Sequence, residues 1–228
     1  DQDNAKNFRF HNGEINISNL SFNYNSRNII KNLNLEIEGG KSTAIVGPTG
    51  CGKSTLTKLL FRFYDPHKGE ISIDKQKLKD CKMDSIRSII GVVPQDTIMF
   101  NNTIGYNLSY GNPNASIKEI RKVVKLCNLD DFIESLDLKY ETIVGERGLK
   151  LSGGEKQRIA IARMMLKKPK ILILDEATSA LDTKTEKLVL DSIDEYFKNS
   201  TKIIIAHRLT TIRTVSYTHL TLPTKRIV

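Results

Sequence analysis

The chain has 228 residues, of which 39% are hydrophobic and 27% are charged, as in soluble globular proteins that bury a substantial core. No apolar run approaches the roughly 18 residues that span a bilayer, and the N-terminus lacks the apolar core of a signal peptide. The net charge of +9 raises nucleic acid as a partner, but the densest basic cluster, residues 75–82, has no aromatic residue for base stacking, so we expect none. The three cysteines form no C-x-x-C pair, which favours a reducing compartment and argues against zinc.

The first quarter of the chain is predicted to form an antiparallel β layer. After a polar lead-in over residues 1–13, apolar residues alternate with polar ones between residues 15 and 37, which is typical of half-buried strands. Tyr24 lies in this layer, where it is either a cross-strand packing residue or a ring available for stacking. A Gly39-Gly40 turn then leads into a short apolar strand that ends at Val46.

The stretch that follows this strand is the strongest motif in the chain. Residues 47–55 read GPTGCGKST and match G-x-x-x-x-G-K-[ST] at every fixed position, with a helix predicted over residues 53–64. Gly50 and Gly52 let backbone N–H groups converge on phosphates, and the helix N-terminus adds the positive end of its dipole. Lys53 is expected to reach the β- and γ-phosphates, and the Ser54 hydroxyl to ligate Mg²⁺. The residues expected to contact the nucleotide are Gly47, Pro48, Thr49, Gly50, Cys51, Gly52, Lys53, Ser54 and Thr55.

The middle of the chain is predicted to be mainly helical, from about residue 96 to residue 167. It follows a strand at residues 69–73, a short helix over residues 83–90 and a strand at residues 91–93 that runs out at Gln95. Ser116 and Glu119 have the spacing of a capping box at the start of a helix.

A second glycine-rich segment lies at residues 151–155, which read LSGGE directly before a helix predicted over residues 156–166. Ser152 and Glu155 again have capping-box spacing, and Gly153 and Gly154 leave backbone N–H groups exposed at a helix N-terminus. The pattern predicts a second anion site.

The last third of the chain returns to an alternation of strand and helix. The continuous apolar run 171–174 ends in Asp175-Glu176, as expected for a buried parallel strand with carboxylates at its C-terminal edge. Open α/β sheets bind ligands at that edge. A helix over residues 183–198 and a last apolar strand over residues 201–206, ending at His207, complete the pattern.

Taken together, the chain resembles the nucleotide-binding domain of ATP-binding-cassette (ABC) transporters over about residues 13–213. The resemblance rests on an ordered set of features: Tyr24, GPTGCGKST at 47–55, Gln95, LSGGE at 151–155, ILILDE at 171–176, SALD at 179–182, and His207. It implies an α/β fold with a P-loop NTPase core, a RecA-like parallel sheet, an antiparallel β subdomain and an inserted helical subdomain. The implied ranges are 14–95 and 168–213 for the core and about 96–167 for the helical subdomain.

The resemblance implies a division of labour around ATP. Tyr24 stacks on adenine and the phosphate loop holds the triphosphate. Ser54 and Gln95 ligate Mg²⁺, and Asp175 reaches the metal through water.

It also implies which residues act in hydrolysis. Glu176 polarises the attacking water and His207 contacts the γ-phosphate, with Lys53 and Gln95 as the remaining catalytic residues. A protein catalyses phosphoryl transfer mainly by positioning the reactants and neutralising charge, so these residue types suffice.

The resemblance further implies partners. Ser152, Gly153, Gly154 and Glu155 close on the ATP of a second such domain, in a homodimer or a pseudo-dimer. Glu146-Arg147 meets a membrane domain expected upstream of Asp1, which makes the chain membrane-associated and facing the cytosol or the mitochondrial matrix. The run VGERGLKLSGGEKQR at residues 144–158 is most similar to B-subfamily half-transporters of mitochondrial and heavy-metal type, with multidrug-type exporters close behind.

Two other function classes are possible, and the C-terminal tail does not match the family. A soluble ABC ATPase acting on nucleic acid or the ribosome is the second function class, but residues 95–152 lack the length and heptads of a coiled coil. A P-loop kinase or GTPase does not explain LSGGE. Residues 214–228 do not match the family, and we interpret them as a truncation followed by foreign sequence. The transported substance cannot be read from these residues.

Overall fold

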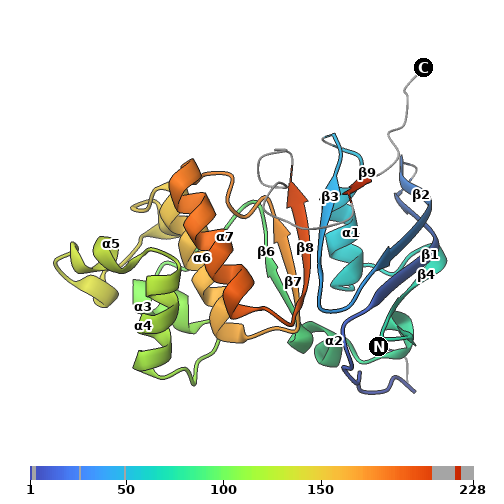
Figure 1. The fold of residues 1–228 in the computed structure, drawn as a ribbon, viewed down its shortest axis with the longest axis horizontal. Helices are drawn as coiled ribbons and strands as arrows, with labels where there is room; N and C mark the ends of the chain where they lie inside the picture. The colour runs from blue at the N-terminus through green and yellow to red at the C-terminus, as the bar shows by residue number, and fades with distance from the viewer. Residues whose placement is uncertain (2–3, 26, 49, 207–218, 222–228) are drawn as a thin grey trace. The chain divides into compact units, whose positions relative to one another are not determined.

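The computed structural model describes residues 1, 4–25, 27–48, 50–206 and 219–221. Figure 1 shows the helices and strands of the chain, which divides into two compact units. Unit 1 comprises residues 1–91, 170–175 and 199–228, and unit 2 comprises residues 92–169 and 176–198.

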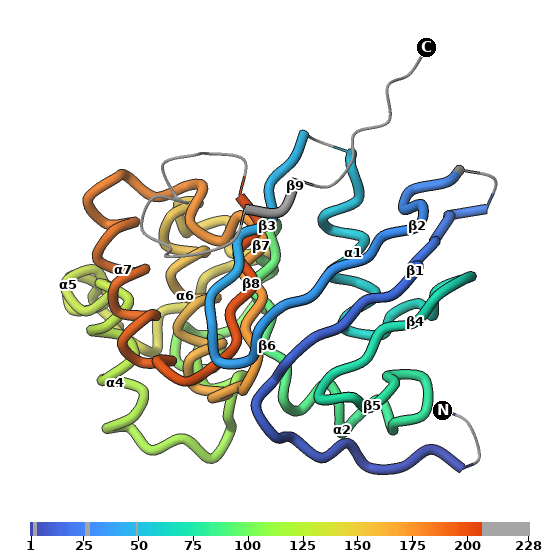
Figure 2. Tube along the Cα trace, turned by 45° about the vertical axis from the view of Figure 1, so that its right-hand side comes forward, coloured from blue at the N-terminus to red at the C-terminus, as the bar shows by residue number. Residues whose placement is uncertain are grey.

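The first sheet of unit 1 is antiparallel and has the strand order β2-β1-β4-β5 (Figure 2). Its strands are β1 (Ile15–Tyr24), β2 (Arg27–Ile37), β4 (Lys68–Ile73) and β5 (Gln76–Lys77). The alternation seen in the sequence buries one face, on which Ile15, Ile17 and Leu35 are almost inaccessible to solvent. The predicted antiparallel layer is therefore confirmed.

The second sheet has the strand order β6-β7-β8-β3-β9. Its strands are β6 (Ile90–Val93), β7 (Ile171–Asp175), β8 (Thr201–Ala206), β3 (Ser42–Val46) and β9 (His219–Thr221). β3, β7 and β8 run parallel to one another. Every residue of β7 and β8 is buried, as expected for central strands of a parallel sheet. These strands, with α1 (Lys53–Leu60) and α2 (Met83–Ile89), form the predicted α/β core.

A short strand in the unmatched tail was not expected from the sequence. β9 pairs in parallel with β3, with Ala44 opposite His219 and Val46 opposite Thr221. The rest of the tail and His207 lie outside the described residues.

The polar lead-in is tied to the turn between β4 and β5. The Asp74 carboxylate accepts hydrogen bonds from the backbone N–H groups of His11 (2.8 Å), Gly13 (2.9 Å) and Glu14 (3.1 Å). Phe8, also in the lead-in, is buried, and its backbone N–H donates to the Ser85 hydroxyl. These contacts attach the lead-in to the rest of unit 1.

Unit 2 is mainly helical. Its α-helices are α3 (Ile104–Ser109), α4 (Ile117–Leu126), α5 (Asp130–Glu134), α6 (Gly153–Lys167) and α7 (Thr183–Tyr196). The short 3₁₀ helices of the chain are η1 (Leu78–Asp80) in unit 1 and η2 (Lys139–Glu141) and η3 (Glu146–Gly148) in unit 2. α6 packs against α3 and α4. Both predicted capping boxes are present, at Ser116 and Ser152. Within the described ranges, no helix is both long and apolar enough to cross a membrane.

Candidate functional site

The phosphate loop joins β3 to α1 in unit 1. Gly50 and Gly52 have φ angles of 81° and 104°, a region that residues with a Cβ rarely enter, so these positions favour glycine. Lys53 is only 5% exposed. Its ammonium donates to the carbonyl oxygens of Gly47 (2.6 Å) and Pro48 (3.0 Å), which holds the loop closed on itself.

Two residues at the start of α1 differ in exposure. Ser54, the second residue of α1, is exposed, whereas Gly52 is buried, with an added Cβ 3.2 Å from Ile30. Thr49 lies outside the described residues. The loop therefore combines a buried cation, an exposed hydroxyl and a helix N-terminus within a few residues, which is an arrangement suited to phosphate.

Asp175 lies at the same edge of the parallel sheet as the phosphate loop. In the register of the sheet, Val46 at the end of β3 is opposite Ala206, and Asp175 at the end of β7 is opposite Ile205. Because β3, β7 and β8 are parallel, their carboxyl ends form one edge. Asp175 is 6% exposed. Its oxygens and the Ser54 hydroxyl are the hard donors that Mg²⁺ prefers, so the residues present fit this metal.

Tyr24 ends β1 and stands among other rings. Its ring meets Phe22 edge-on at 4.9 Å and Tyr64 edge-on at 5.4 Å between centroids, and the Lys58 ammonium lies 5.9 Å from its centroid. The side chain is partly exposed. In the described part of the chain its hydroxyl is one of two buried side-chain polar atoms without a hydrogen bond.

Glu176 and Gln95 meet within unit 2. Nε2 of Gln95 donates to Oε2 of Glu176 at 3.1 Å. Glu176 also has a φ of 51°, a left-handed conformation that costs a non-glycine residue about 1–2 kcal/mol. Strain of this kind persists where surrounding contacts over-determine the backbone, and it gathers at functional sites.

The segment 151–155, here called the signature segment, caps α6. The Ser152 hydroxyl accepts from the Glu155 N–H (3.3 Å), and a Glu155 carboxylate oxygen accepts from the Ser152 N–H (2.7 Å). Ser152 and Gly153 are exposed, and a Cβ added to Gly154 would lie 3.3 Å from the Ala180 carbonyl oxygen. The start of α6 is thus exposed at Ser152 and Gly153, while the helix packs closely on the segment after β7.

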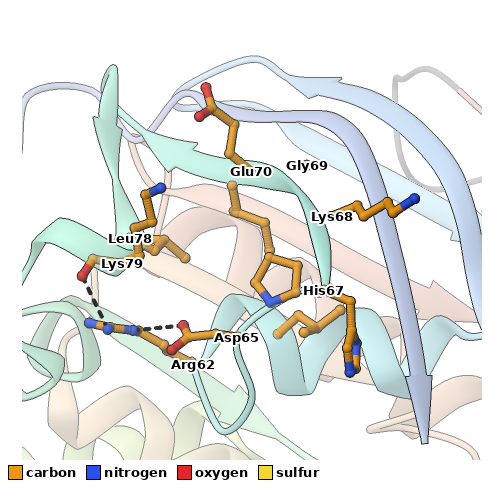
Figure 3. A pocket seen from close by; sticks show the side chains of 11 residues that line it. Arg62, Asp65, His67, Lys68, Gly69, Glu70, Leu78 and Lys79 are labelled. Carbon is orange, nitrogen blue, oxygen red and sulfur yellow. Dashed lines mark hydrogen bonds and ion pairs between the residues drawn. The ribbon is translucent and has the colours of Figure 1, made fainter.

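A pocket of about 380 Å³ in unit 1 lies near the other end of α1 (Figure 3). Arg62 contributes to its lining and is 7% exposed; its Nε donates to Asp65 (3.0 Å) and its Nη2 to the Lys79 carbonyl oxygen (3.1 Å). The lining mixes both signs of charge, from Asp65, Glu70, Lys68 and Lys79. Because the phosphate loop precedes the N-terminus of α1, this pocket is separate from the nucleotide site.

The structure reveals two features that sequence reasoning missed. Gln157 is buried and hydrogen-bonded to the segment after β7. The second feature is a cluster of exposed rings around Arg163 in unit 2, formed by Phe100, Tyr106 and Tyr110. The four-residue spacing of the two tyrosines could have signalled a shared helix face. No local signal marks Gln157, because its burial depends on residues about twenty positions away.

These features define a P-loop nucleoside triphosphatase with an antiparallel β layer and an inserted helical region. A family model described as "ABC transporter" matches residues 30–179. The chain therefore belongs to the ABC transporter family, as its ATP-binding and ATP-hydrolysing domain.

The chain is similar over most of its length to exporters of Atm1 type. It is 51% identical over 203 residues to the "Iron-sulfur clusters transporter ATM1, mitochondrial" of Chaetomium globosum, covering 88% of this chain and 34% of that protein. It is also 51% identical over 199 residues to the "ATM1-type heavy metal exporter" of Novosphingobium aromaticivorans, covering 87% and 33%. The chain thus spans about a third of the length of these curated relatives.

A solved structure agrees with these likenesses. The "Structure of a bacterial Atm1-family ABC exporter with ATP bound" superposes with a TM-score of 0.95 at 47% identity, over 98% of this chain and 39% of that one. Nothing in the comparisons supports an action on nucleic acid or the ribosome.

Proposed function

We propose that the chain is the ATP-driven motor of a membrane exporter of Atm1 type. The observation that carries this proposal is the presence, in one chain, of a phosphate loop and a signature segment, on a fold that matches an ATP-bound exporter over 98% of its length. The names of the relatives support transport of iron-sulfur or heavy-metal cargo over multidrug export. The domain bounds predicted above stay part of this proposal.

The nucleotide is held in unit 1 by its triphosphate. Residues 47–55 surround the phosphates with backbone N–H groups, and Lys53 neutralises charge on the β- and γ-phosphates. Tyr24 stacks on adenine from the end of β1. Ser54, Gln95 and Asp175 would hold Mg²⁺, and the ion would neutralise charge on the phosphate oxygens when bound.

Hydrolysis requires a polarised water. Glu176 accepts the hydrogen bond of the attacking water, and the bond from Gln95 to its carboxylate (3.1 Å) supports this role because it orients one carboxylate oxygen. His207 contacts the γ-phosphate. Lys53 stabilises the charge of the transition state.

The signature segment serves the nucleotide of a second copy. Ser152, Gly153, Gly154 and Glu155 form an open helix tip whose N–H groups and dipole suit a γ-phosphate. Two copies therefore enclose two ATP molecules head to tail, and hydrolysis releases them. A cycle of closing and opening then moves the attached membrane segments.

The membrane domain contacts unit 2. Phe100, Tyr106 and Tyr110 are 36%, 45% and 55% exposed, and an exposed group of aromatic rings is typical of an interaction surface. Glu146 and Arg147 contribute from η3, where Arg147 has a φ of 49°. We propose that the membrane domain lies upstream in the same protein and that the chain faces the cytosol or the mitochondrial matrix.

Loss of hydrolysis in Glu176→Gln tests this function. The variant keeps the size and the contact with Gln95 but cannot polarise water as a carboxylate does, so we expect ATP affinity within about twofold of wild type and a hundredfold or greater loss of phosphate release. Phosphate release with Mg²⁺ and calorimetric ATP binding measure the two quantities. A variant that still hydrolyses ATP at the wild-type rate would remove Glu176 from the mechanism.

A further inference from the structure

Gln157 connects α6 to the segment that follows β7. Its side chain is 4% exposed, and its amide has three partners, all within residues 176–180, here called the 176–180 loop. Oε1 accepts from the Ala180 N–H at 2.9 Å, and Nε2 donates to the Ser179 hydroxyl at 3.0 Å and to the Glu176 carbonyl oxygen at 3.4 Å. One buried glutamine thus binds both ends of the loop.

The 176–180 loop needs such support from outside. Glu176 holds a φ of 51°, and the turn has an internal bond from the Ser179 N–H to the Glu176 carbonyl oxygen (3.1 Å). Left-handed backbone at a non-glycine residue is maintained by contacts that disfavour the alternatives. Gln157 supplies such contacts to the backbone, while Gln95 holds the carboxylate at 3.1 Å.

The same helix face carries the glycines of the signature segment. Gly153 and Gly154 precede Gln157 by four and three residues, so the three positions share one face of α6. A Cβ on Gly153 would lie 3.4 Å from the Ala180 side chain, and a Cβ on Gly154 would lie 3.3 Å from the Ala180 carbonyl oxygen. The start of α6 and the 176–180 loop therefore form one closely packed body inside unit 2.

We propose that Gln157 is a positioning residue for ATP hydrolysis. It contacts no nucleotide; it fixes the 176–180 loop so that the Glu176 carboxylate stays oriented, and it ties that orientation to the signature segment at the start of α6. This inference rests on the role of Glu176 under the proposed function. A buried side-chain amide is suited to this task because it satisfies a donor and an acceptor of the loop at once.

Gln157→Leu tests the inference because it keeps most of the volume and removes all three polar contacts. Misplacing a reacting group lowers turnover with little effect on nucleotide binding, so we expect kcat to fall roughly tenfold to a hundredfold and KM for ATP to change less than about threefold.

Gln76→Leu is the matched control. Gln76 also clamps a backbone segment with its amide, accepting from the Arg9 N–H (3.0 Å) and donating to the Arg9 carbonyl oxygen (2.6 Å), but it lies in unit 1. Its kcat should stay within about twofold of wild type. If Gln157→Leu does not fold, Gln157→Asn takes its place, because its shorter side chain cannot reach all three partners.

The double variant Gln157→Leu with Glu176→Gln separates positioning from general damage. Because Gln157 acts through Glu176, the double variant should hydrolyse ATP no more slowly than Glu176→Gln alone in single-turnover assays. An unchanged kcat in folded Gln157→Leu or Gln157→Asn, or an equal loss of kcat and ATP affinity, would overturn the inference. A Glu176→Gln variant that still turns over would instead overturn the proposed role of Glu176.

Discussion

At the scale of single residues, the phosphate loop is built around one buried lysine. Lys53 is 5% exposed and donates to two loop carbonyl oxygens. It therefore holds the conformation of the loop and also gives the loop a positive charge. We therefore expect a substitution of Lys53 to weaken nucleotide binding. Gly50 and Gly52 have φ angles of 81° and 104°. Residues with a Cβ adopt such angles only with strain, so both positions favour glycine.

We expect Lys53→Ala to weaken ATP binding by about 2 kcal/mol or more, roughly thirtyfold in Kd, because hydrogen bonds to charged phosphate oxygens are lost. Isothermal calorimetry with ATP and Mg²⁺ measures the change. Lys41→Ala is a control, since Lys41 is exposed and forms an ion pair with Glu38 on the surface. Equal affinities for the two variants would refute the assignment of the phosphate loop.

At the scale of elements, helix ends are fixed by small polar contacts. Ser116 caps α4, and Glu119 accepts from the Ser116 N–H (3.0 Å) and from the Lys168 ammonium (2.5 Å) at the end of α6. The hydrogen bond from Lys168, with those from Ser116, lowers the pKa of Glu119 to about 2. This carboxylate therefore joins two helices of unit 2 only while it is ionised.

The sign of the resulting pH dependence follows from the lowered pKa. The contribution of Glu119 to stability is fully present above its ordinary pKa of 4.5 and is lost as the pH falls toward about 2. We expect Glu119→Gln to lower Tm at neutral pH, and the gap to wild type to narrow as the pH falls below 4.5. Thermal unfolding monitored by circular dichroism measures this gap. A difference in Tm that widens toward acid pH would contradict the prediction. As a control, Glu119→Gln should lower Tm less in a Lys168→Ala background, where its ion-pair partner is absent.

Most elements could be predicted from the sequence because their signals are local. The alternation between residues 15 and 37 gave the antiparallel layer, and the run 171–174 gave a buried parallel strand. α6 begins at Gly153 rather than Lys156, since Ser152 is its N-cap and the two glycines already have helical geometry. α1 ends at Leu60, short of the predicted Tyr64, and Arg62 then has a φ of 51°.

The remaining features depend on distant residues. The strand β9 exists through pairing with β3, which lies some 175 positions earlier in the chain, and the tail sequence alone did not indicate a partner. Gln157 is likewise defined by residues 176–180, which approach it only in the folded unit. Long-range pairing of this kind has no periodic signature in the sequence.

At the scale of the whole molecule, the residues of the proposed site are divided between the two units. Unit 1 holds the phosphate loop and Asp175, and unit 2 holds Gln95, Glu176 and the signature segment. The helix tip at Ser152 and the phosphate loop at Lys53 both attract anions, so in the proposed dimer the two sites would face the phosphates of one ATP from opposite sides. ATP-driven dimerisation is therefore the central requirement of the proposed function.

The molar mass of the Glu176→Gln variant in solution tests this claim most directly. With saturating ATP and Mg²⁺, light scattering should show the mass of the 25.7 kDa chain double, because unhydrolysed nucleotide holds two copies together. Ser152→Arg, which blocks the helix tip, should abolish the doubling without loss of ATP binding. A Glu176→Gln variant that stays monomeric with ATP bound, or a dimer that forms equally well with Ser152→Arg, would contradict the account.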